Sequence, residues 1–477
     1  MFKEYDYANK PVVEIVDEIL LDAIALRASD IHFDPTPEAL NVRVRVDGEL
    51  RKYATVPEVV KKNLITRIKI ISGMNITEMR LPQDGAIKNL GKKASLDLRV
   101  SSLPIAFGEK IVIRILDYEM SSSGLDSLGF SPNNFQKIKK LISLPNGIIL
   151  VSGATGTGKS TTVYSMLQEL NTESRNIITV EDPIEMKVDG INQVQVMSEI
   201  GLTFASTLRS ILRQDPDIIM IGEMRDDETA RIAVRASITG HLVLSTIHTN
   251  SALNTIERLL DMNVERYLLG TAISGIIAQR LTKKLCPHCR QPRALTEQEK
   301  KLFKIVTNYD MNEIYIPCGC DQCVNGYKGR VSIHEVLVID QDIRDDLAKG
   351  ADKSNLRDTV YNSPEMTTLL QDGLEKVAAG LTSLDEIYRI IDVVDDLKDE
   401  STELKDAFLG NPIVEDTLFE EDTLEVTQVA TPTDTTVQSI ETIDTIDSMT
   451  DTLEVSPLPD QMVAPVAEVM PTDVETL

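Results

Sequence analysis

The stretch GATGTGKS, residues 153–160, decides the fold of this 477-residue chain. It follows the apolar run 148–151 and precedes residues 161–170, a segment compatible with a helix. Glycines let the backbone N–H groups of such a loop turn toward phosphates, and the positive N-terminal end of the following helix adds to the attraction. This strand-loop-helix context separates a nucleotide-binding loop from a glycine-rich turn without a ligand. The stretch therefore predicts an α/β domain that binds a nucleoside triphosphate.

Three further apolar runs follow, and each ends at or beside an acidic or histidine side chain. Residues 217–222 (DIIMIG) are typical of a buried parallel strand, which delivers Glu223 at the sheet edge where open α/β sheets bind ligands. Glu223 is our candidate for orienting or deprotonating the attacking water. The alternative is a strand-end acid that simply faces solvent.

The other two runs add weaker candidates. Residues 177–180 lead into EDPIE (181–185), where three acids within five positions suit metal and water positioning, although acidic turns are usually just solvated. His241 and His248 flank the run 242–245. An imidazole beside the γ-phosphate could sense the nucleotide state, but a lone histidine is more often structural. The predicted catalytic residues of this part are Glu181, Glu223, His241 and His248.

The expected ligand is ATP with Mg²⁺. Lys159 should reach the β- and γ-phosphates, and the Ser160 hydroxyl should ligate the Mg²⁺ ion. The predicted nucleotide-binding residues are Gly153, Ala154, Thr155, Gly156, Thr157, Gly158, Lys159, Ser160, Thr161, Asp182 and Glu185.

In this order the motifs resemble those of the type II secretion and type IV pilus assembly ATPases (the GspE/PulE/PilB-like group), over roughly residues 11–395. In that family GATGTGKS is Walker A, TVEDPIE (179–185) the aspartate box, IIMIGEMRD (218–226) Walker B and GHLVLSTIHTN (240–250) the histidine box. The resemblance implies a RecA-like P-loop ATPase domain. It also implies that Glu223 is the catalytic glutamate and that His241 and His248 contact the nucleotide region.

The same resemblance implies a function. It predicts a Mg²⁺-dependent ATP hydrolase, hexameric in the family, that powers pilin or pseudopilin assembly by turning an inner-membrane platform protein. The motifs do not choose between a pilus, a secretion pseudopilus and a DNA-uptake filament. Longer members carry an extra N-terminal domain that docks on membrane partners, whereas this chain begins almost at once with the second domain.

All five cysteines fall within residues 286–323. Cys286 and Cys289 form CPHC, Cys320 and Cys323 form CDQC, and 30 residues separate the two pairs. Two such knuckles can close a tetrahedral thiolate site, which predicts structural Zn²⁺. A redox pair is the alternative, although no thioredoxin-like βαβ pattern surrounds either pair. Cys318 is left as a free thiol or an alternative ligand. The resemblance adds that assembly-type members of the family carry this insert.

Residues before about 118 have periodicities of their own. Helical spacing in 11–27 gives way to alternation in LNVRVRVDGEL (40–50), where DG is a hairpin turn signal. A helix over 59–72 and strands over 94–101 and 109–116 complete an α+β domain. It resembles the second N-terminal domain of the family, through SDIHFDP, RVDG, RLPQDG and GEKIVIRIL.

Arginines of such a domain could act as fingers on the γ-phosphate. Arg80, Arg99 and Arg114 are the candidates, and the alternative for each is a strand-face cation paired with a surface acid. The family usually continues QDG with arginine, whereas Ala86 follows here. Either the finger role rests on other arginines, or catalysis is weaker than in relatives.

The remaining segments complete the predicted organisation. SSSGLDSLGFSPNN (121–134) reads as a hinge, and residues 340–397 as roughly three amphipathic helices. Residues 406–477 contain 17 acidic residues and no Lys or Arg, so they carry −17 of the net charge of −26 and are predicted to be a disordered spacer or a partner-docking segment. The predicted order is an α+β domain (1–120), a linker (121–134), a RecA-like ATPase core (135–285), a tetracysteine zinc insert (286–330), a helical subdomain (331–400) and a disordered acidic tail (401–477).

Composition limits the other functions. The negative net charge gives no electrostatic reason to expect nucleic acid, and 4% aromatic residues without Trp argue against a nucleic-acid motor with a zinc ribbon. No apolar run approaches the ~20 residues of a membrane span. We therefore expect a cytoplasmic protein, peripheral to the membrane through its partners. A nucleotide-gated assembly factor with little turnover is the remaining alternative.

Overall fold

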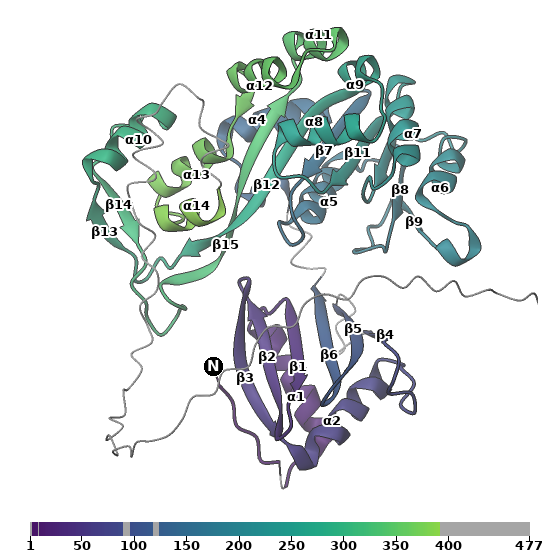
Figure 1. The fold of residues 1–477 in the computed structure, drawn as a ribbon, viewed down its shortest axis with the longest axis vertical. Helices are drawn as coiled ribbons and strands as arrows, with labels where there is room; N and C mark the ends of the chain where they lie inside the picture. Colours follow the sequence, from purple (N-terminus) through teal and green to yellow (C-terminus); the bar gives the residue numbers. More distant parts are fainter. Residues whose placement is uncertain (1, 8, 89–95, 118–123, 392–477) are drawn as a thin grey trace, which may run out of the picture. The chain divides into compact units, whose positions relative to one another are not determined.

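The computed structural model describes residues 2–7, 9–88, 96–117 and 124–391. The described residues before 118 form a six-stranded antiparallel sheet (Figure 1). In its second strand the alternation seen in the sequence is realised, because Val42 and Val44 are buried while Arg43 and Arg45 are only half-buried. The turn at Asp47 and Gly48 has positive φ angles of 51° and 90°, as a tight hairpin requires. In spatial order, the strands are β3 (Glu49–Pro57), β2 (Ala39–Val46), β1 (Asp30–Pro35), β6 (Gly108–Asp117), β5 (Leu96–Ile105) and β4 (Gln83–Lys88).

Two helices, α1 (Val12–Ala25) and α2 (Glu58–Ile71), cover one face of this sheet (Figure 1). Their buried residues join the inward-facing residues of the strands in a single core, with Ile19 and Leu64 fully buried at its centre. The other face of the sheet carries the polar residues of each alternation. Charged side chains of this part of the chain therefore lie within strands.

The second sheet has eight strands and is built differently. The strands β12, β7, β11, β10, β8 and β9 are mutually parallel. Beyond β12, β15 pairs antiparallel with β12, and β16 pairs antiparallel with β15. Their bounds, in chain order, are β7 (Gly147–Ser152), β8 (Ile177–Glu181), β9 (Asn192–Gln195), β10 (Ile218–Ile221), β11 (Leu242–Ile247), β12 (Ile273–Leu285), β15 (Tyr327–Val338) and β16 (Met366–Thr367).

Helices bury both faces of this sheet. Within β7, Ile148 and Leu150 belong to one core, and Ile149 and Val151 to a second. The first core is closed by α6 (Phe204–Ile211), α7 (Asp227–Ile238), α8 (Ala252–Asp261), α9 (Arg266–Ala272), α11 (Gln341–Lys349) and α12 (Lys353–Asn362). The second is closed by α4 (Pro132–Ile142), α5 (Lys159–Leu170) and η2 (Leu125–Leu128). Since both faces are covered, the strands are continuous apolar runs.

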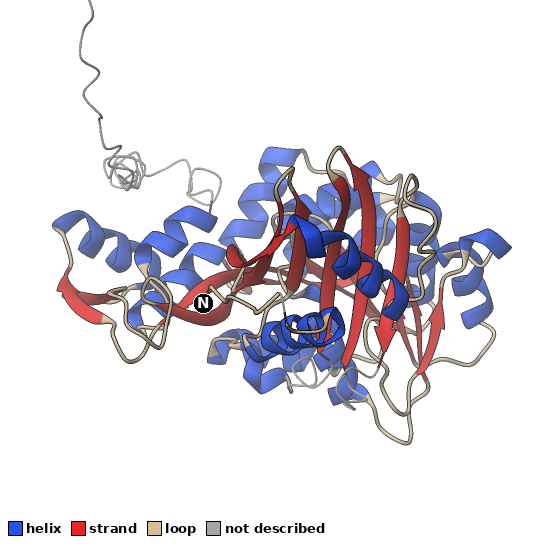
Figure 2. Cartoon of the chain, turned by 90° about the horizontal axis from the view of Figure 1, so that it is seen from below, coloured by secondary structure: helices blue, strands red, loops and turns tan. Residues whose placement is uncertain are grey.

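The long pair β12 and β15 runs out of the sheet toward β13 (Gln291–Ala294), β14 (Glu313–Ile316) and α10 (Glu297–Thr307) (Figures 1 and 2). A separate core lies here, formed with α13 (Leu369–Ala378) and α14 (Leu384–Ile390). After β15 the described residues contain four helices, α11 to α14, where the sequence predicted roughly three.

The predicted linker and tail are only partly described. Within residues 121–134, a short 3-10 helix occupies Leu125–Leu128, and α4 begins at Pro132, with Ser131 accepting a hydrogen bond from Asn134 N at 3.3 Å. Residues 121–123 and the predicted tail 401–477 lie outside the described residues. Among the described helices, none has the length and apolar character to span a membrane.

Candidate nucleotide site and cysteine cluster

The phosphate-binding loop joins β7 to α5 at the carboxyl edge of the parallel strands. Gly153, Gly156 and Gly158 have φ angles of 149°, 82° and 88°, a region that favours glycine. At Gly153 space also demands glycine, because an added Cβ would lie 2.5 Å from Thr157 Oγ1 and 2.6 Å from Gln279 O. Residues 154–156 are exposed, so the loop is open toward solvent where a phosphate would enter.

Lys159 begins helix α5 and folds back over the loop. Its Nζ donates to Gly153 O at 2.8 Å and to Ala154 O at 3.0 Å. Burial lowers the pKa of this ammonium, while the nearby charges of Glu223 and Glu185 act in the opposite direction. The loop therefore holds its cation at the centre of the turn. Ser160 and Thr161, the predicted Mg²⁺ ligand and its neighbour, lie half-buried in the first turn of α5.

Sequence reasoning missed Gln279, which braces this loop from β12. Its side chain is 2% exposed; Nε2 donates to Thr157 O at 2.7 Å, and Oε1 accepts from Thr162 Oγ1 at 2.7 Å. No local motif marks this glutamine. Its role depends on the pairing of β12 with β7, which lie far apart in the chain.

Glu223 follows β10 at the same edge of the sheet. Its carboxylate forms an ion pair with Arg225 and lies 3.6 Å, Oε2 to Nε2, from His248. The Glu223 side chain is 14% exposed, so it is reachable and yet partly shielded. Burial lowers the pKa of His248, and the Lys159 charge lowers it further. A neutral imidazole, a carboxylate and the loop lysine thus share one edge.

The backbone that carries Glu223 is fixed from both neighbouring strands. Gly222 N donates to Val180 O at 2.8 Å, and Thr246 Oγ1 donates to Gly222 O at 2.7 Å. Met224 N donates to Thr246 O at 3.0 Å. These bonds hold the backbone on either side of Glu223 in place.

Glu181, the third predicted catalytic acid, is 3% exposed at the end of β8. Its carboxylate accepts hydrogen bonds from Tyr164 OH, from Thr179 Oγ1 at 2.6 Å and from Gln193 Nε2 at 3.1 Å. Burial, and then the neighbouring Glu181 charge, raise the pKa of Tyr164. These contacts favour a role for Glu181 in joining β8, α5 and β9.

Asp182 and Glu185 lie exposed in the turn that follows β8. The Glu185 charge acts on the pKa of Lys159, and the Asp182 charge on that of Arg225. Both acids are therefore near the cations of the site without being buried in it.

The prediction that His241 contacts the nucleotide region is wrong within this chain. His241 lies at the amino end of β11, where its carbonyl accepts from Gly147 N at 3.2 Å and its Nδ1 lies 2.9 Å from Ala236 O. His248 lies beyond the other end of that six-residue strand. Six residues of β-strand span about 20 Å, so the two histidines are at opposite edges of the sheet.

Two of the candidate finger arginines, Arg99 and Arg114, lie in strands of the six-stranded sheet, and Arg80 lies in the loop before β4. Arg99 Nη2 donates to Ile184 O, at 3.2 Å, in the turn after β8. Arg114 pairs with Asp30, Nε to Oδ1 at 3.1 Å. Arg80 pairs with Glu78, and its side chain is 88% exposed. Of the three, Arg99 is the one whose hydrogen bond reaches the turn after β8.

The two CxxC pairs meet at the far end of the β12–β15 pair. The four Sγ atoms of Cys286, Cys289, Cys320 and Cys323 all lie within 4.8 Å of one another. Cys289 to Cys323 and Cys320 to Cys323 measure 3.6 Å, and Cys286 to Cys320 measures 3.9 Å. Four sulfurs bound at ~2.3 Å around a tetrahedral ion would be about 3.8 Å apart, whereas a disulfide needs ~2.05 Å. The four thiols therefore fit Zn²⁺.

Neither the fifth cysteine nor the buried His334 joins this cluster. Cys318 is exposed and lies outside the group of four. His334 is fully buried in β15, with its ring centroid 3.9 Å from that of Phe130 and the two rings tilted by 32°. His334 is thus a core residue.

Comparisons with known proteins extend over most of the chain. A family model described as "Type II/IV secretion system protein" matches residues 6–389. The type II secretion system protein E of Dickeya dadantii is 44% identical over 384 residues, which cover 80% of this chain and 76% of that protein. The type IV pilus assembly ATPase PilB of Acinetobacter baylyi is 44% identical over 386 residues, 80% of this chain and 66% of that protein.

A solved structure supports the fold. The pilus retraction motor PilT with bound ADP has a TM-score of 0.56 to this chain at 29% identity, covering 80% of this chain and 98% of that one. This likeness confirms the predicted fold class, with a RecA-like ATPase domain. The resemblance inferred from the order of the motifs is confirmed as well.

Proposed function

This chain belongs to the type II/IV secretion system protein family, and we propose that it is an ATPase motor that powers the assembly of a pilin or pseudopilin filament. One observation carries the proposal: the phosphate loop, Glu223 and His248 converge on one edge of the parallel sheet. Relatives named for type II secretion and for pilus assembly support the mechanical role.

The loop is suited to bind the phosphates of ATP. Its positive-φ glycines and the N-terminus of α5 present backbone N–H groups to an anion. On binding of ATP, Lys159 would exchange its two carbonyl contacts for the β- and γ-phosphates. The Ser160 hydroxyl would hold Mg²⁺, which would neutralise charge on the phosphates. Gln279 keeps the turn in shape during this exchange.

Glu223 is the proposed base or orienting group for the attacking water. A carboxylate held by its backbone neighbours can keep a water in line with the γ-phosphate. His248 has a lowered pKa and is therefore neutral near pH 7. It can respond to the phosphate without forming a cation that pairs with Glu223. Arg99, Arg114 and Arg80 are the proposed sources of positive charge for the transition state.

In the cell, we propose a homo-oligomeric motor, hexameric as in its family, that works at the inner face of the membrane through a platform protein. The closing of the arginine-bearing sheet toward the nucleotide would convert nucleotide state into movement. A DNA-uptake filament would use the same chemistry.

The test is ATP turnover by the purified full chain with Mg²⁺. Glu223→Gln is expected to bind ATP and to lose at least roughly 100-fold in kcat. Glu199→Gln, which alters an exposed acid in the 3-10 helix Ser198–Ile200, is the matched control. Normal turnover by Glu223→Gln would remove it from catalysis. In cells, loss of surface filaments in that variant identifies a pilus motor, whereas loss of secreted proteins identifies a secretion motor.

We also propose that the four clustered cysteines hold a structural Zn²⁺ ion. Coordination free energy at such a site is folding free energy, so removing one ligand should release the metal and loosen the surrounding segment. Elemental analysis should find one zinc per chain, and none in Cys286→Ser. Cys318→Ser, which alters the exposed fifth thiol, should keep the metal. Full zinc content in Cys286→Ser would contradict this ligand set.

A further inference from the structure

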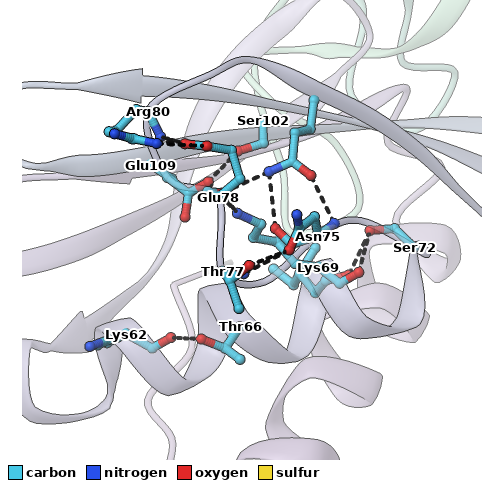
Figure 3. A network of polar contacts seen from close by, with 12 residues as sticks. Lys62, Thr66, Lys69, Ser72, Asn75, Thr77, Glu78, Arg80, Ser102 and Glu109 are labelled. Carbon is cyan, nitrogen blue, oxygen red and sulfur yellow. Dashed lines mark hydrogen bonds and ion pairs between the residues drawn. The ribbon is translucent and has the colours of Figure 1, made fainter.

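A buried lysine of the six-stranded domain bonds to a loop. Lys69, in the last turn of α2, has a side chain only 1% exposed. Its Nζ donates to Glu109 Oε1 at 2.6 Å and to Glu78 O at 2.7 Å (Figure 3). Ser102 Oγ donates to the same Glu109 oxygen at 3.0 Å. The ammonium thus joins helix α2, strand β6 and the loop of residues 75–82 that leads into β4.

That loop is held by a small set of polar contacts. Glu78 O accepts a second hydrogen bond, from Gln83 Nε2 at 2.8 Å. Gln83 also accepts from Asn75 N at 2.8 Å and donates to Asn75 O at 3.1 Å. Asn75 Oδ1 in turn accepts from Thr77 N at 3.0 Å. In Figure 3, Asn75, Thr77 and Glu78 of this loop lie next to Lys69.

Apolar packing does not fix this loop. Ile76, Met79 and Leu81 are 41%, 45% and 61% exposed, so none of them anchors it in the core. Loops without buried apolar contacts open readily, and their conformation depends on the hydrogen bonds that remain. Lys69 supplies one of these from beneath, out of solvent.

The loop carries Arg80, the most exposed of the three finger candidates. Glu78, whose carbonyl Lys69 holds, uses its carboxylate to accept from Arg80 N at 2.7 Å and from Arg80 Nη2 at 3.1 Å. Hydrogen bonding to Arg80 lowers the pKa of Glu78 to about 2. The chain of contacts therefore runs from Glu109 through Lys69 and Glu78 to the guanidinium.

A buried ion pair is weak grounds for stability, because an uncharged pair of similar volume often serves as well. Its geometry is more informative. Lys69 donates one of its hydrogen bonds to a backbone carbonyl of a surface loop, two residues before Arg80. We propose that Lys69 and Glu109 are positioning residues that hold the loop of residues 75–82 so that Arg80 is presented in one orientation. This inference rests on the proposed role of Arg80 in ATP hydrolysis.

The experiment uses the full chain and a set of matched variants. Lys69→Met with Glu109→Gln removes both charges together, so that neither is left buried and unpaired. Lys62→Met, an exposed lysine of the same helix, is the control. Arg80→Ala removes the guanidinium, and the triple variant combines Arg80→Ala with the pair. The measurements are melting temperature, kcat and KM for ATP, and hydrogen exchange of the amides of residues 75–80.

We expect the paired variant to melt within a few degrees of the unaltered chain and to keep its KM. Its kcat should fall about tenfold, as far as in Arg80→Ala, and the triple variant should fall no further, because residues that act as a unit are not additive. The amides of Asn75, Thr77 and Arg80 should exchange faster in the paired variant. In Lys62→Met their exchange rates should be unchanged.

Other results overturn the inference in distinguishable ways. If the paired variant has a normal kcat while Arg80→Ala has a lowered kcat, the positioning role is refuted and the role of Arg80 stands. Additive losses in the triple variant show that Lys69 acts through something other than Arg80. Normal kcat in Arg80→Ala refutes the proposed role of that arginine, and the positioning inference falls with it.

Discussion

The parallel and the antiparallel sheets of this chain present charged side chains in opposite ways. Every residue of β7, β8, β10 and β11 is buried. Helices cover both faces, so functional groups are confined to the loops after these strands. In the described part of the six-stranded sheet, α1 and α2 cover one face, and charged side chains lie inside the strands, on the other face.

This difference decides how each sheet meets a ligand. On the parallel sheet, Lys159 and Glu223 follow apolar runs, and the strand ends bring them together. On the antiparallel sheet, register does this work: Ala86 lies opposite Arg99, Arg99 opposite Arg114, and Arg114 opposite Asp30. Residues directly opposite on neighbouring strands share a face. The result is a row of side chains in which two are arginines.

The largest effect should come from the parallel sheet. Lys159→Ala removes the buried ammonium that the loop is shaped around, so ATP binding should become undetectable and turnover should fall by at least roughly 100-fold. Equilibrium binding of a labelled ATP analogue measures this directly. Lys187→Ala, an exposed lysine beyond the aspartate box, is the control. Retained affinity in Lys159→Ala would contradict the assignment of this loop.

A smaller effect is expected from the antiparallel sheet. Arg99→Ala should lower kcat about tenfold with little change in KM, because its charge is proposed to act on the transition state. Arg43→Ala, on the same face and paired with Asp34 at 2.7 Å, is the matched control. If both variants lose activity equally, the row has no special role and the sheet contributes only general positive charge.

The local parts of this arrangement were predictable from sequence. The P-loop, the acid after β10 and the two CxxC pairs each depend on neighbours in the chain. Gln279 was not predictable, because it reaches the P-loop only through the pairing of β12 with β7. The error over His241 has a related cause. Flanking one strand in the sequence looks like proximity, but a six-residue strand separates its ends by about 20 Å.

Long-range polar pairs could not be predicted from the sequence for the same reason. Lys69 and Glu109 are 40 positions apart and meet because β6 lies centrally in the sheet while α2 packs on it. The row of Ala86, Arg99 and Arg114 likewise requires the strand order β4-β5-β6 and its register. Periodicity indicates which face a residue occupies, but it does not state which residue on the next strand lies opposite.

Histidines offer a subtler comparison of the two sheets. Burial lowers the pKa of His248 at the nucleotide edge and also that of His32 on the antiparallel sheet. Protonated His248 would be a cation that pairs with the Glu223 carboxylate. Turnover should therefore fall severalfold as the pH drops below the ordinary histidine pKa of about 6.5. A profile of kcat from pH 5 to 8 should show this acid limb in the unaltered chain and in His32→Gln. His248→Gln should lack it.

The smallest effect comes from extending the row of arginines. Ala86 is exposed at the β4 end of the row, opposite Arg99. Ala86→Arg places a third guanidinium there, and like charges directly opposite on a sheet destabilise by about 0.5 kcal/mol. Thermal unfolding should show this small loss at low salt, and added salt should reduce it by screening.

The same substitution separates two functions. If the row faces the γ-phosphate of bound ATP, Ala86→Arg should raise kcat about twofold or more even as it lowers stability, since the added charge is neutralised only when the phosphate is present. If turnover does not change, Ala86 is neutral in catalysis. If the unaltered chain barely turns over and Ala86→Arg restores turnover, the alanine has made this chain a nucleotide-gated assembly factor. Ala86→Gln, which adds length without charge, distinguishes the effect of charge from that of size.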